Sequence, residues 1–432
     1  MKTTGVLKKL GEWGLVLAGI TLVAWSCTNG GEEPKATAPE DQAEVGTVES
    51  VLGAIPIPPG NPQTPEKVEL GKMLFFDPRL SGNNQMACAT CHSPDNGFSD
   101  GVPRNSGPKG ELGRNSPTIW NAAFADFLFW DGRVASLEEQ AAKPIPADVE
   151  MAQPIPELIE ELKAIPQYPE LFGKAFGSEE ITFTRIIRAI AAFERTIVTA
   201  NSPFDRFQAG DQTALSMEAQ EGMRLFNDKA ACVSCHAAPH FTDYSFHVLG
   251  VPEVGPKLAD VAASQQRAEG LIPRGRRVPA DLGRFEVTGD PQELGAFKTP
   301  TLRNTELTGP YMHDGVFPTL EEVVAFYNRG GGDADNKSPL IQPLNLSPEE
   351  EKALVAFLKS LTDTSVRVEP PELPPGPGGS PAPPPGGAAM LRPQGATGKT
   401  DAPAVAAGQH AGGPLAKLRV SGFGRTHLLL SR

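Results

Sequence analysis

Two C-x-x-C-H strings constrain this chain most strongly. They are Cys88-Ala-Thr-Cys91-His92 and Cys232-Val-Ser-Cys235-His236. The pattern is a specific signal for a covalently attached c-type haem, because two thiols bond its vinyl groups and the adjacent imidazole reaches the iron. A redox disulfide or half a zinc site would need only the cysteine pair. Since each pair has its own histidine, we predict two haems held by Cys88, Cys91, Cys232 and Cys235, with His92 and His236 as proximal iron ligands.

The N-terminal residues predict export. Lys2, Lys8 and Lys9 precede an apolar run from Gly14 to Trp25, which is typical of a signal peptide and too short for an ordinary membrane-spanning helix. The residues before Cys27 resemble a lipoprotein cleavage site, so Cys27 is a candidate for lipidation; alternatively, it is lost with the leader. We therefore place the protein in the periplasm or cell envelope, free or held by a lipid anchor.

Composition divides the rest of the chain. The 432 residues include 43 prolines and 45 glycines, many of them in the C-terminal part. We predict a leader at 1–27, a flexible tether at 28–50 and a Pro/Gly-rich disordered tail at 369–432. The net charge is −13, and the leader and tail are both net positive, so the body between them is more acidic still. This charge argues against nucleic acid and would suit a small basic protein partner.

The body contains an internal repeat. Three blocks recur in the same order, the pairs being Glu69–Asp77 with Gln220–Asp228, Pro117–Asn121 with Pro300–Asn304, and Arg188–Phe193 with Lys352–Phe357. Apolar spacing predicts helices at 65–76, 156–164, 180–199, 216–227, 319–328 and 347–361. We therefore expect an all-α protein with two tandem cytochrome c-like haem domains from an internal duplication, at 51–205 and 206–368, with long irregular loops.

The repeat also reveals a difference between the halves. Tyr327 closes a helical segment of the second half, and its counterpart in the first half is Pro144. Tyrosine can ligate ferric iron, whereas proline cannot. If the second haem takes its sixth ligand from Tyr327, the first haem is open. Taken by spacing alone, Tyr327 is better interpreted as a core aromatic residue.

These motifs and their order resemble the bacterial dihaem cytochrome c peroxidase family, which includes MauG-type enzymes. The matching segments are Leu74–Leu80, Arg114–Thr118, Phe129–Arg133, Val149–Met151, Pro300–Asn304 and Pro310–Gly315. The resemblance covers nearly the whole body. It implies an N-terminal haem that reacts with peroxide and a C-terminal haem that transfers electrons.

The resemblance also implies roles for single residues. Glu150 falls on the family's distal acid/base and Gln140 on its companion; one carboxylate can move both protons of peroxide cleavage. Without the resemblance, Glu150 would be taken for a solvated loop residue. Trp130 falls on the tryptophan between the haems, although it could also be a core residue. The family's calcium site falls on Asn115, Thr308 and Pro310, whose oxygens suit a hard cation.

Two departures from the family's peroxidases bear on function. The segment Asn105–Gly113 contains no histidine, so we expect an open first haem without prior reductive activation. Tyr327 stands where those peroxidases have methionine, as in MauG-type enzymes. An anionic oxygen ligand favours ferric iron, which puts the physiological reductant in doubt.

Three functions are compatible with these sequence features. The first is a peroxidase that reduces hydrogen peroxide to water with electrons from a small cytochrome c or cupredoxin. The alternative is a MauG-like oxidase that uses a bis-high-valent dihaem state to oxidise a protein or organic substrate. The third is a non-enzymatic dihaem electron carrier. A homodimer is compatible with all three.

Overall fold

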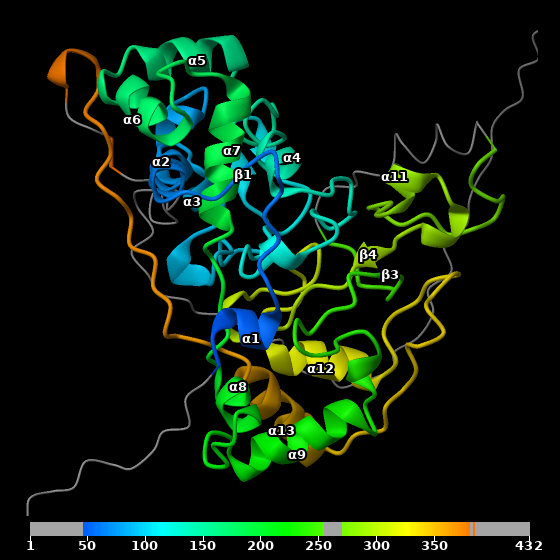
Figure 1. Ribbon diagram of the computed structural model, residues 1–432. Coiled ribbons are helices and arrows are strands. Elements are labelled where there is room, and N and C mark those ends of the chain that lie inside the picture. Colours follow the sequence, from blue (N-terminus) through cyan, green and yellow to red (C-terminus); the bar gives the residue numbers. More distant parts are fainter. Residues whose placement is uncertain (1–45, 255–269, 381–382, 385–432) are drawn as a thin grey trace, which may run out of the picture.

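Helices gather at two ends of the protein, and loops fill the space between them (Figure 1). The computed structural model describes residues 46–254, 270–380 and 383–384. The helices are α1 (Val48–Leu52), α2 (Pro65–Phe76), α3 (Cys88–Cys91), α4 (Leu137–Ala141), α5 (Ile155–Lys163), α6 (Gln167–Phe176), α7 (Phe183–Glu194), α8 (Pro203–Gln208), α9 (Met217–Asn227), α11 (Phe285–Thr288), α12 (Leu320–Asn328) and α13 (Pro348–Lys359). Short 3-10 turns lie at Pro78–Leu80, Pro94–Asn96, Ala122–Phe124, Cys232–Ser234, Pro291–Glu293, Thr305–Leu307 and Pro377–Gly379. The expectation of a mostly helical protein is therefore confirmed.

The first helical group is built on the contact between α2 and α7. Thr64 caps α2 and Thr182 caps α7, each with its side-chain oxygen accepting a backbone N–H of the first turn. Gly71 lets the two backbones meet, because a Cβ at this position would lie 1.8 Å from the carbonyl oxygen of Ala189. The core of this group lies within residues 70–197.

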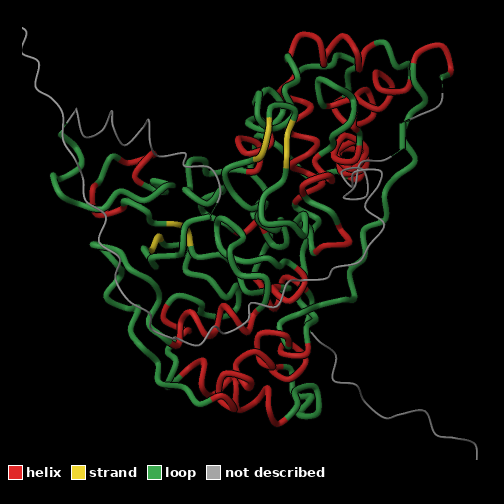
Figure 2. The backbone as a smooth tube through the Cα atoms, turned by 180° about the vertical axis from the view of Figure 1, so that it is seen from behind, coloured by secondary structure: helices red, strands yellow, loops and turns green. Residues whose placement is uncertain are grey.

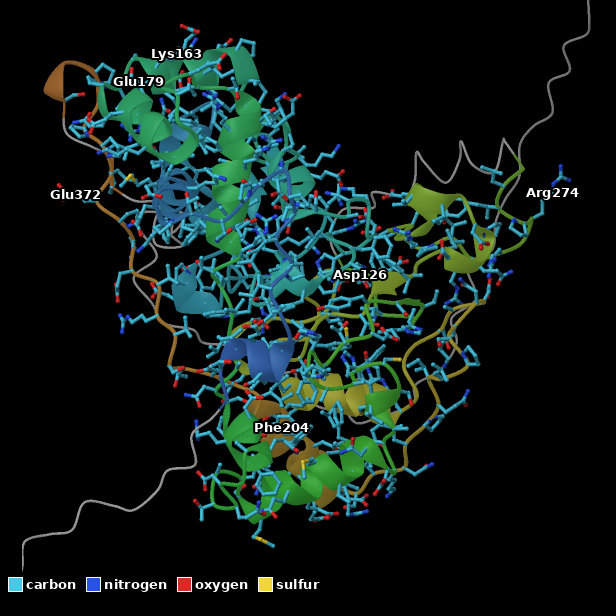
Figure 3. All side chains as sticks on the ribbon, viewed as in Figure 1. Asp126, Lys163, Glu179, Phe204, Arg274 and Glu372 are labelled. Carbon is cyan, nitrogen blue, oxygen red and sulfur yellow. The ribbon has the colours of Figure 1, made fainter. Side chains whose placement is uncertain are left out.

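The second helical group repeats this contact with α9 and α13. A Cβ on Gly222 would lie 1.9 Å from the carbonyl oxygen of Ala353. The core of this group lies within residues 204–361 and includes Phe204 of α8, labelled in Figure 3. Gly71 and Gly222 hold the same position in the repeated sequence blocks, so the same close helix contact occurs in both halves.

Strands are short: one pair lies beside the helices of the first group, and the other lies among the loops (Figure 2). The strands β1 (Ser106–Gly107) and β2 (Gly110–Glu111) form one antiparallel pair, with Ser106 opposite Glu111. The strands β3 (Phe246–His247) and β4 (Phe297–Lys298) form another, with His247 opposite Phe297. Both pairs fix loops around the candidate sites described below.

The expected boundaries need three corrections. The helix predicted at 180–199 ends at Glu194, because the chain turns so that the Thr199 N–H reaches Asn121 Oδ1 at 2.9 Å. The predicted tether overlaps α1, which begins at Val48. The predicted tail begins too early, because Leu373 is 3% exposed and the Pro374 carbonyl accepts a 3.0 Å hydrogen bond from Arg79.

The remaining predictions for the termini lie outside the described residues. These are the leader at 1–27 with Cys27, the tether up to residue 45, and the tail beyond residue 384. Within the described part of the chain, no helix is both long and apolar enough to cross a membrane.

Candidate haem sites

The first C-x-x-C-H string forms a single helical turn followed by its histidine. The turn is α3, and its end is closed by a 2.9 Å hydrogen bond from the His92 N–H to the Cys88 carbonyl. The His92 Nδ1 lies 3.2 Å from the Phe98 carbonyl oxygen. Burial lowers the pKa of His92, so the ring is neutral. A neutral imidazole that donates from Nδ1 to a carbonyl presents Nε2 as a metal ligand.

The second string repeats this arrangement. Residues Cys232–Ser234 form a 3-10 turn, and the His236 N–H donates to the Cys232 carbonyl at 2.9 Å. The His236 Nδ1 lies 2.9 Å from the carbonyl oxygen of Phe241. Burial lowers the pKa of His236 as well. Both histidines are therefore oriented alike, as proximal iron ligands would be.

The four cysteines of these strings are free thiols. Burial raises the pKa of Cys88, Cys91 and Cys232, which keeps these thiols neutral. A structural zinc site would require thiolates. Neutral buried thiols do not fit a reactive redox pair, whose nucleophile is a thiolate.

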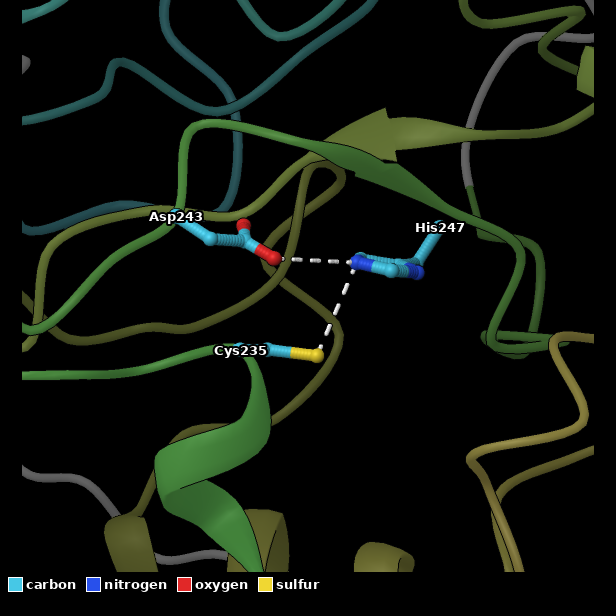
Figure 4. A group of neighbouring side chains, drawn as sticks. All are labelled: Cys235, Asp243 and His247. Carbon is cyan, nitrogen blue, oxygen red and sulfur yellow. Dashed lines mark hydrogen bonds and ion pairs between the residues drawn. The ribbon is translucent and has the colours of Figure 1, made fainter.

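Cys235 also takes part in a smaller cluster with Asp243 and His247 (Figure 4). The His247 Nε2 lies 3.5 Å from Cys235 Sγ and 3.5 Å from Asp243 Oδ2. Thiol, imidazole and carboxylate could together hold a metal ion. Attachment of a haem to Cys235 would use its sulfur, however, and leave only the Asp243–His247 pair.

A cavity of about 460 Å³ adjoins the second string. Its size lies in the usual range for cofactor pockets. Cys232, Cys235 and His236 line it together with Tyr327, the next-to-last residue of α12. The Tyr327 hydroxyl makes no hydrogen bond to another described residue, and burial raises its pKa well above the usual range. The structure thus brings the predicted sixth ligand into the pocket of the predicted proximal ligand.

Glu150 lies beside the first string. Its carboxylate is close enough to raise the pKa of Cys88 and Cys91 electrostatically. Burial raises the pKa of Glu150 itself, an effect that Arg133 partly opposes. The solvated-loop alternative does not fit this environment. A carboxyl group with a raised pKa is suited to exchanging protons near neutral pH.

The loop that carries Glu150 is held by close backbone contacts. The Gly82 N–H donates to the Met151 carbonyl at 2.9 Å. On the other side, a Cβ added to Gly107 of β1 would lie 1.8 Å from the Val149 carbonyl oxygen. Gln140 lies on α4, which Ser136 caps, and its side chain makes no hydrogen bond to another described residue. The structure therefore fixes the Glu150 loop and does not bring Gln140 into hydrogen-bond contact with it.

Trp130 is hydrogen-bonded through both its side chain and its backbone. Its Nε1 donates to the Asn115 carbonyl at 2.9 Å, and its own carbonyl accepts the Lys298 N–H at 2.8 Å. Trp130 also lines the cavity of the second string. Reciprocally, the Asn115 N–H donates to the carbonyl of His313 at 2.7 Å. In the repeat alignment His313 corresponds to Trp130 and Lys298 to Asn115. The two backbone hydrogen bonds, from Lys298 to Trp130 and from Asn115 to His313, therefore form a pseudo-symmetric pair.

The three residues assigned to calcium line this same cavity. Asn115 Nδ2 donates to the Val102 carbonyl at 2.9 Å, which leaves Oδ1 free to accept or to ligate. The Thr308 hydroxyl instead donates to the Thr305 carbonyl at 3.1 Å. Asn115, Thr308 and Pro310 are therefore neighbours of one cavity, while an ion bound by them stays a prediction.

Sequence reasoning missed several polar residues of the cavity, among them His247 and Lys298. His247 and Lys298 come from the paired strands β3 and β4, and both line it. Neither belongs to a motif. The available signal was the repeat itself, in which the charged Lys298 corresponds to the neutral Asn115.

Fold and site together define a helical oxidoreductase with two C-x-x-C-H sites. Residues 65–213 match the family model described as di-haem cytochrome c peroxidase. A cytochrome-c peroxidase, IdrP1 of Denitromonas iodatirespirans, is 42% identical over 334 residues, covering 75% of this chain and 89% of that protein. The methylamine utilization protein MauG of Methylorubrum extorquens is 38% identical over 367 residues, covering 84% and 97%.

Solved structures give the same result. A MauG-like protein associated with microbial copper homeostasis superposes with a TM-score of 0.61 at 33% identity, covering 72% of this chain and 93% of that one. The chain therefore belongs to the di-haem cytochrome c peroxidase family, and it is an enzyme of the oxidoreductase class. Membership implies two c-type haems. The relatives carry both peroxidase and MauG names, so membership alone does not decide between these activities.

Proposed function

We propose that this protein reduces hydrogen peroxide to water at an open N-terminal haem, with electrons that arrive through the C-terminal haem from a small redox protein. The observation that carries this proposal is the unequal pair at one repeat position. Tyr327 lines the cavity of the second string, whereas Pro144 stands at the corresponding place in the first half. Only the second iron would then have a sixth protein ligand.

The first site would hold its haem through Cys88 and Cys91, with His92 on the iron. A bound haem would supply an iron centre for peroxide and a redox centre for electrons. Glu150 would take the proton from the peroxide oxygen nearer the iron and return it to the departing oxygen. Burial of Glu150 supports this role, because it holds the carboxyl pKa above its usual value. Gln140 would assist by hydrogen bonding.

The second site would hold its haem through Cys232 and Cys235, with His236 and Tyr327 as the residues that would ligate its iron. Trp130 would serve as the relay between the sites. Its position in the second cavity supports this role, as does its hydrogen bond to Asn115, which follows the first string in the chain. A small cytochrome c or cupredoxin is the donor class we expect, because the acidic body would attract a basic partner.

We further propose that the protein consists of two haem domains derived by duplication, at 51–205 and 206–368. Two lines of evidence support this division. Separate hydrophobic cores lie within 70–197 and 204–361. Equivalent residues also take the same unusual backbone conformation, as in Asn121 (φ 58°, ψ 17°) and Asn304 (φ 60°, ψ 18°). An exported, periplasmic location and a calcium ion at Asn115, Thr308 and Pro310 are parts of the same proposal.

A MauG-like oxidase is the second candidate, and Tyr327 itself favours it. An anionic ligand would make the second iron harder to reduce and easier to oxidise. The enzyme would then take its electrons from a protein or organic substrate, and Trp130 would carry them toward the first site. The two candidates share one site and differ in the source of electrons.

Steady-state kinetics with hydrogen peroxide and a reduced small cytochrome c separate these candidates. The proposal predicts sustained turnover that consumes cytochrome and peroxide in a ratio of two to one. The Glu150→Gln variant supplies the background rate. Negligible turnover in the parent protein, together with a long-lived oxidised species, would contradict the peroxidase proposal and favour the oxidase.

A further inference from the structure

Lys298 lies in the cavity of the second string without a counter-charge. It is the last residue of β4 and one of the residues that line the cavity. No carboxylate of the described residues lies within ion-pair distance of its ammonium group, and its one charge-related contact is the Tyr244 ring, 5.7 Å from Nζ. Burial alone lowers the pKa of Lys298, to about 8. A cation removed from water in this way is costly unless an anion joins it.

Three acidic residues close to the cavity are engaged with other partners. Asp243 pairs with His247, and Asp281 forms a 2.6 Å ion pair with Arg114. Asp335 accepts the Arg277 N–H at 2.7 Å. The anion that Lys298 lacks is therefore more naturally a group that enters the cavity.

We propose that Lys298 binds a propionate of the second haem and raises the reduction potential of that haem. This inference rests on the proposed haem at Cys232 and Cys235. A haem brings its own carboxylates into the cavity, and an ammonium group beside one of them offsets its negative charge. Reduction adds an electron to the site, so a neighbouring positive charge favours the reduced state.

Two further observations give this charge a role in electron transfer. The backbone of Lys298 is fixed by the 2.8 Å hydrogen bond from its N–H to the Trp130 carbonyl, so the residue that carries the charge neighbours the proposed relay in the fold. The corresponding residue of the first half is Asn115, which is neutral. The positive charge would therefore act on one haem of the two, opposing the effect of the Tyr327 ligand on its potential.

The test is a spectroelectrochemical titration of the haem-loaded protein and three variants. Lys298→Gln removes the charge, and Lys298→Arg keeps it. Lys352→Gln is the control, because Lys352 lies at the surface of the same helical group, with its side chain 75% exposed in a pair with Glu218. We expect Lys298→Gln to lower the potential of the second haem and leave the first unchanged. Lys298→Arg and Lys352→Gln should both keep the parent value.

The outcomes separate this inference from the proposed function. Peptide mass spectrometry shows whether Lys298→Gln carries both haems. If it does and the reduction potential of its second haem is unchanged, the role of Lys298 is overturned and the dihaem proposal stays intact. A parent protein with fewer than two attached haems would instead overturn the proposed function. If Lys298→Gln loses its second haem, the fraction of the Cys232/Cys235 peptide that carries haem is compared between the two Lys298 variants. Haem retained in Lys298→Arg supports the propionate contact. Equal loss of haem in both variants contradicts it.

Discussion

At the scale of single residues, the two halves agree where they would hold haem and differ where they would use it. His92 and His236 have the same ring contact to a carbonyl oxygen. By contrast, Tyr327 corresponds to Pro144 and Lys298 to Asn115. Differences of this kind can turn two similar haem sites into one reactive site and one electron-transfer site.

Replacement of Tyr327 by phenylalanine tests the proposed sixth ligand. The change removes only the hydroxyl, so the optical spectrum and spin state of the second haem should change while those of the first stay the same. Tyr311→Phe is the matched control, because Tyr311 lines the same cavity but donates its hydroxyl to the Thr305 carbonyl at 3.1 Å. Identical spectra for the parent and Tyr327→Phe would show that another group ligates the iron.

Glu150→Gln tests the proton transfer. Glutamine keeps the shape of the side chain but accepts no proton, so peroxide turnover should fall about 10²- to 10⁴-fold with both haems attached. Asp148→Asn, at a side chain 74% exposed and two residues away, should retain the parent rate. A Glu150→Gln enzyme as fast as the parent would remove Glu150 from the mechanism.

The pH dependence of the parent enzyme gives an independent check on Glu150. Burial raises the pKa of Glu150 above its ordinary value of 4.5, so its basic form is lost at a higher pH than for a solvated glutamate. We expect kcat/KM to rise with pH through this raised pKa, and the acidic limb to disappear in Glu150→Gln. An acidic limb that persists in the variant would belong to another group.

At the scale of elements, short and irregular segments position the proposed chemistry, while the long helices support them. Helices α2, α7, α9 and α13 build the cores, but Glu150, Trp130 and Lys298 lie on loops or two-residue strands. The hairpin of β1 and β2 reaches the Glu150 loop through Gly107, where a side chain has no room.

Gly107→Ala tests this contact between hairpin and loop. Its Cβ would lie 1.8 Å from the Val149 carbonyl, so the backbone must shift, at a cost of about 1–3 kcal/mol of unfolding free energy. Peroxide turnover should fall and the first haem's spectrum should change, with the second haem unaffected. Gly60→Ala is the control, since its nearest neighbour would be 4.0 Å away. Normal turnover in Gly107→Ala would show that the loop does not depend on the hairpin.

The difference between long core-building helices and short irregular segments also explains what the sequence could predict. Periodic apolar residues and caps located α2, α9, α12 and α13 to within about two residues, because those helices bury one face against a core. The end of α7 was misplaced because residues 195–199 leave the helix for a long-range bond to Asn121. Lys298 was missed for the same physical reason: its importance arises from a cavity formed by distant segments and leaves no local pattern.

At the scale of the whole molecule, both ends of the described chain cross from one helical group to the other (Figure 1). Ser50 and Val51 of α1 line a cavity with Phe204 and Phe357 of the second core. Val368, after α13, packs against the first core, and Arg79 bonds the Pro374 carbonyl. Arg114 adds ion pairs to Asp131 and Asp281, each at 2.6 Å. These contacts hold the two sites in a fixed relation, which the proposed electron transfer through Trp130 would require.

Global stability should depend on one buried acid, Glu194. This residue is 4% exposed, and burial raises its pKa to about 8. The folded protein therefore binds this proton more tightly than the unfolded chain does. The contribution to stability is complete below the unfolded pKa, near 4.5, and is lost as pH rises through 8.

Glu194→Gln should therefore lose less stability than the parent between pH 6 and pH 9. The measurement is Tm of the haem-loaded protein at both pH values. Glu179→Gln, at an exposed residue on the surface of the first helical group (Figure 3), should follow the parent. The same drop in Tm for Glu194→Gln and the parent would show that Glu194 carries no proton in the folded protein at neutral pH.

The central claim is that one haem is open and the other is closed by Tyr327. Electron paramagnetic resonance of the resting ferric protein tests this claim most directly. The proposed function predicts one high-spin signal from the haem at His92 and one low-spin signal from the haem at His236, in equal amounts, with the low-spin signal altered in Tyr327→Phe. Two low-spin signals in the resting protein would mean that both irons have six ligands, and would contradict the account.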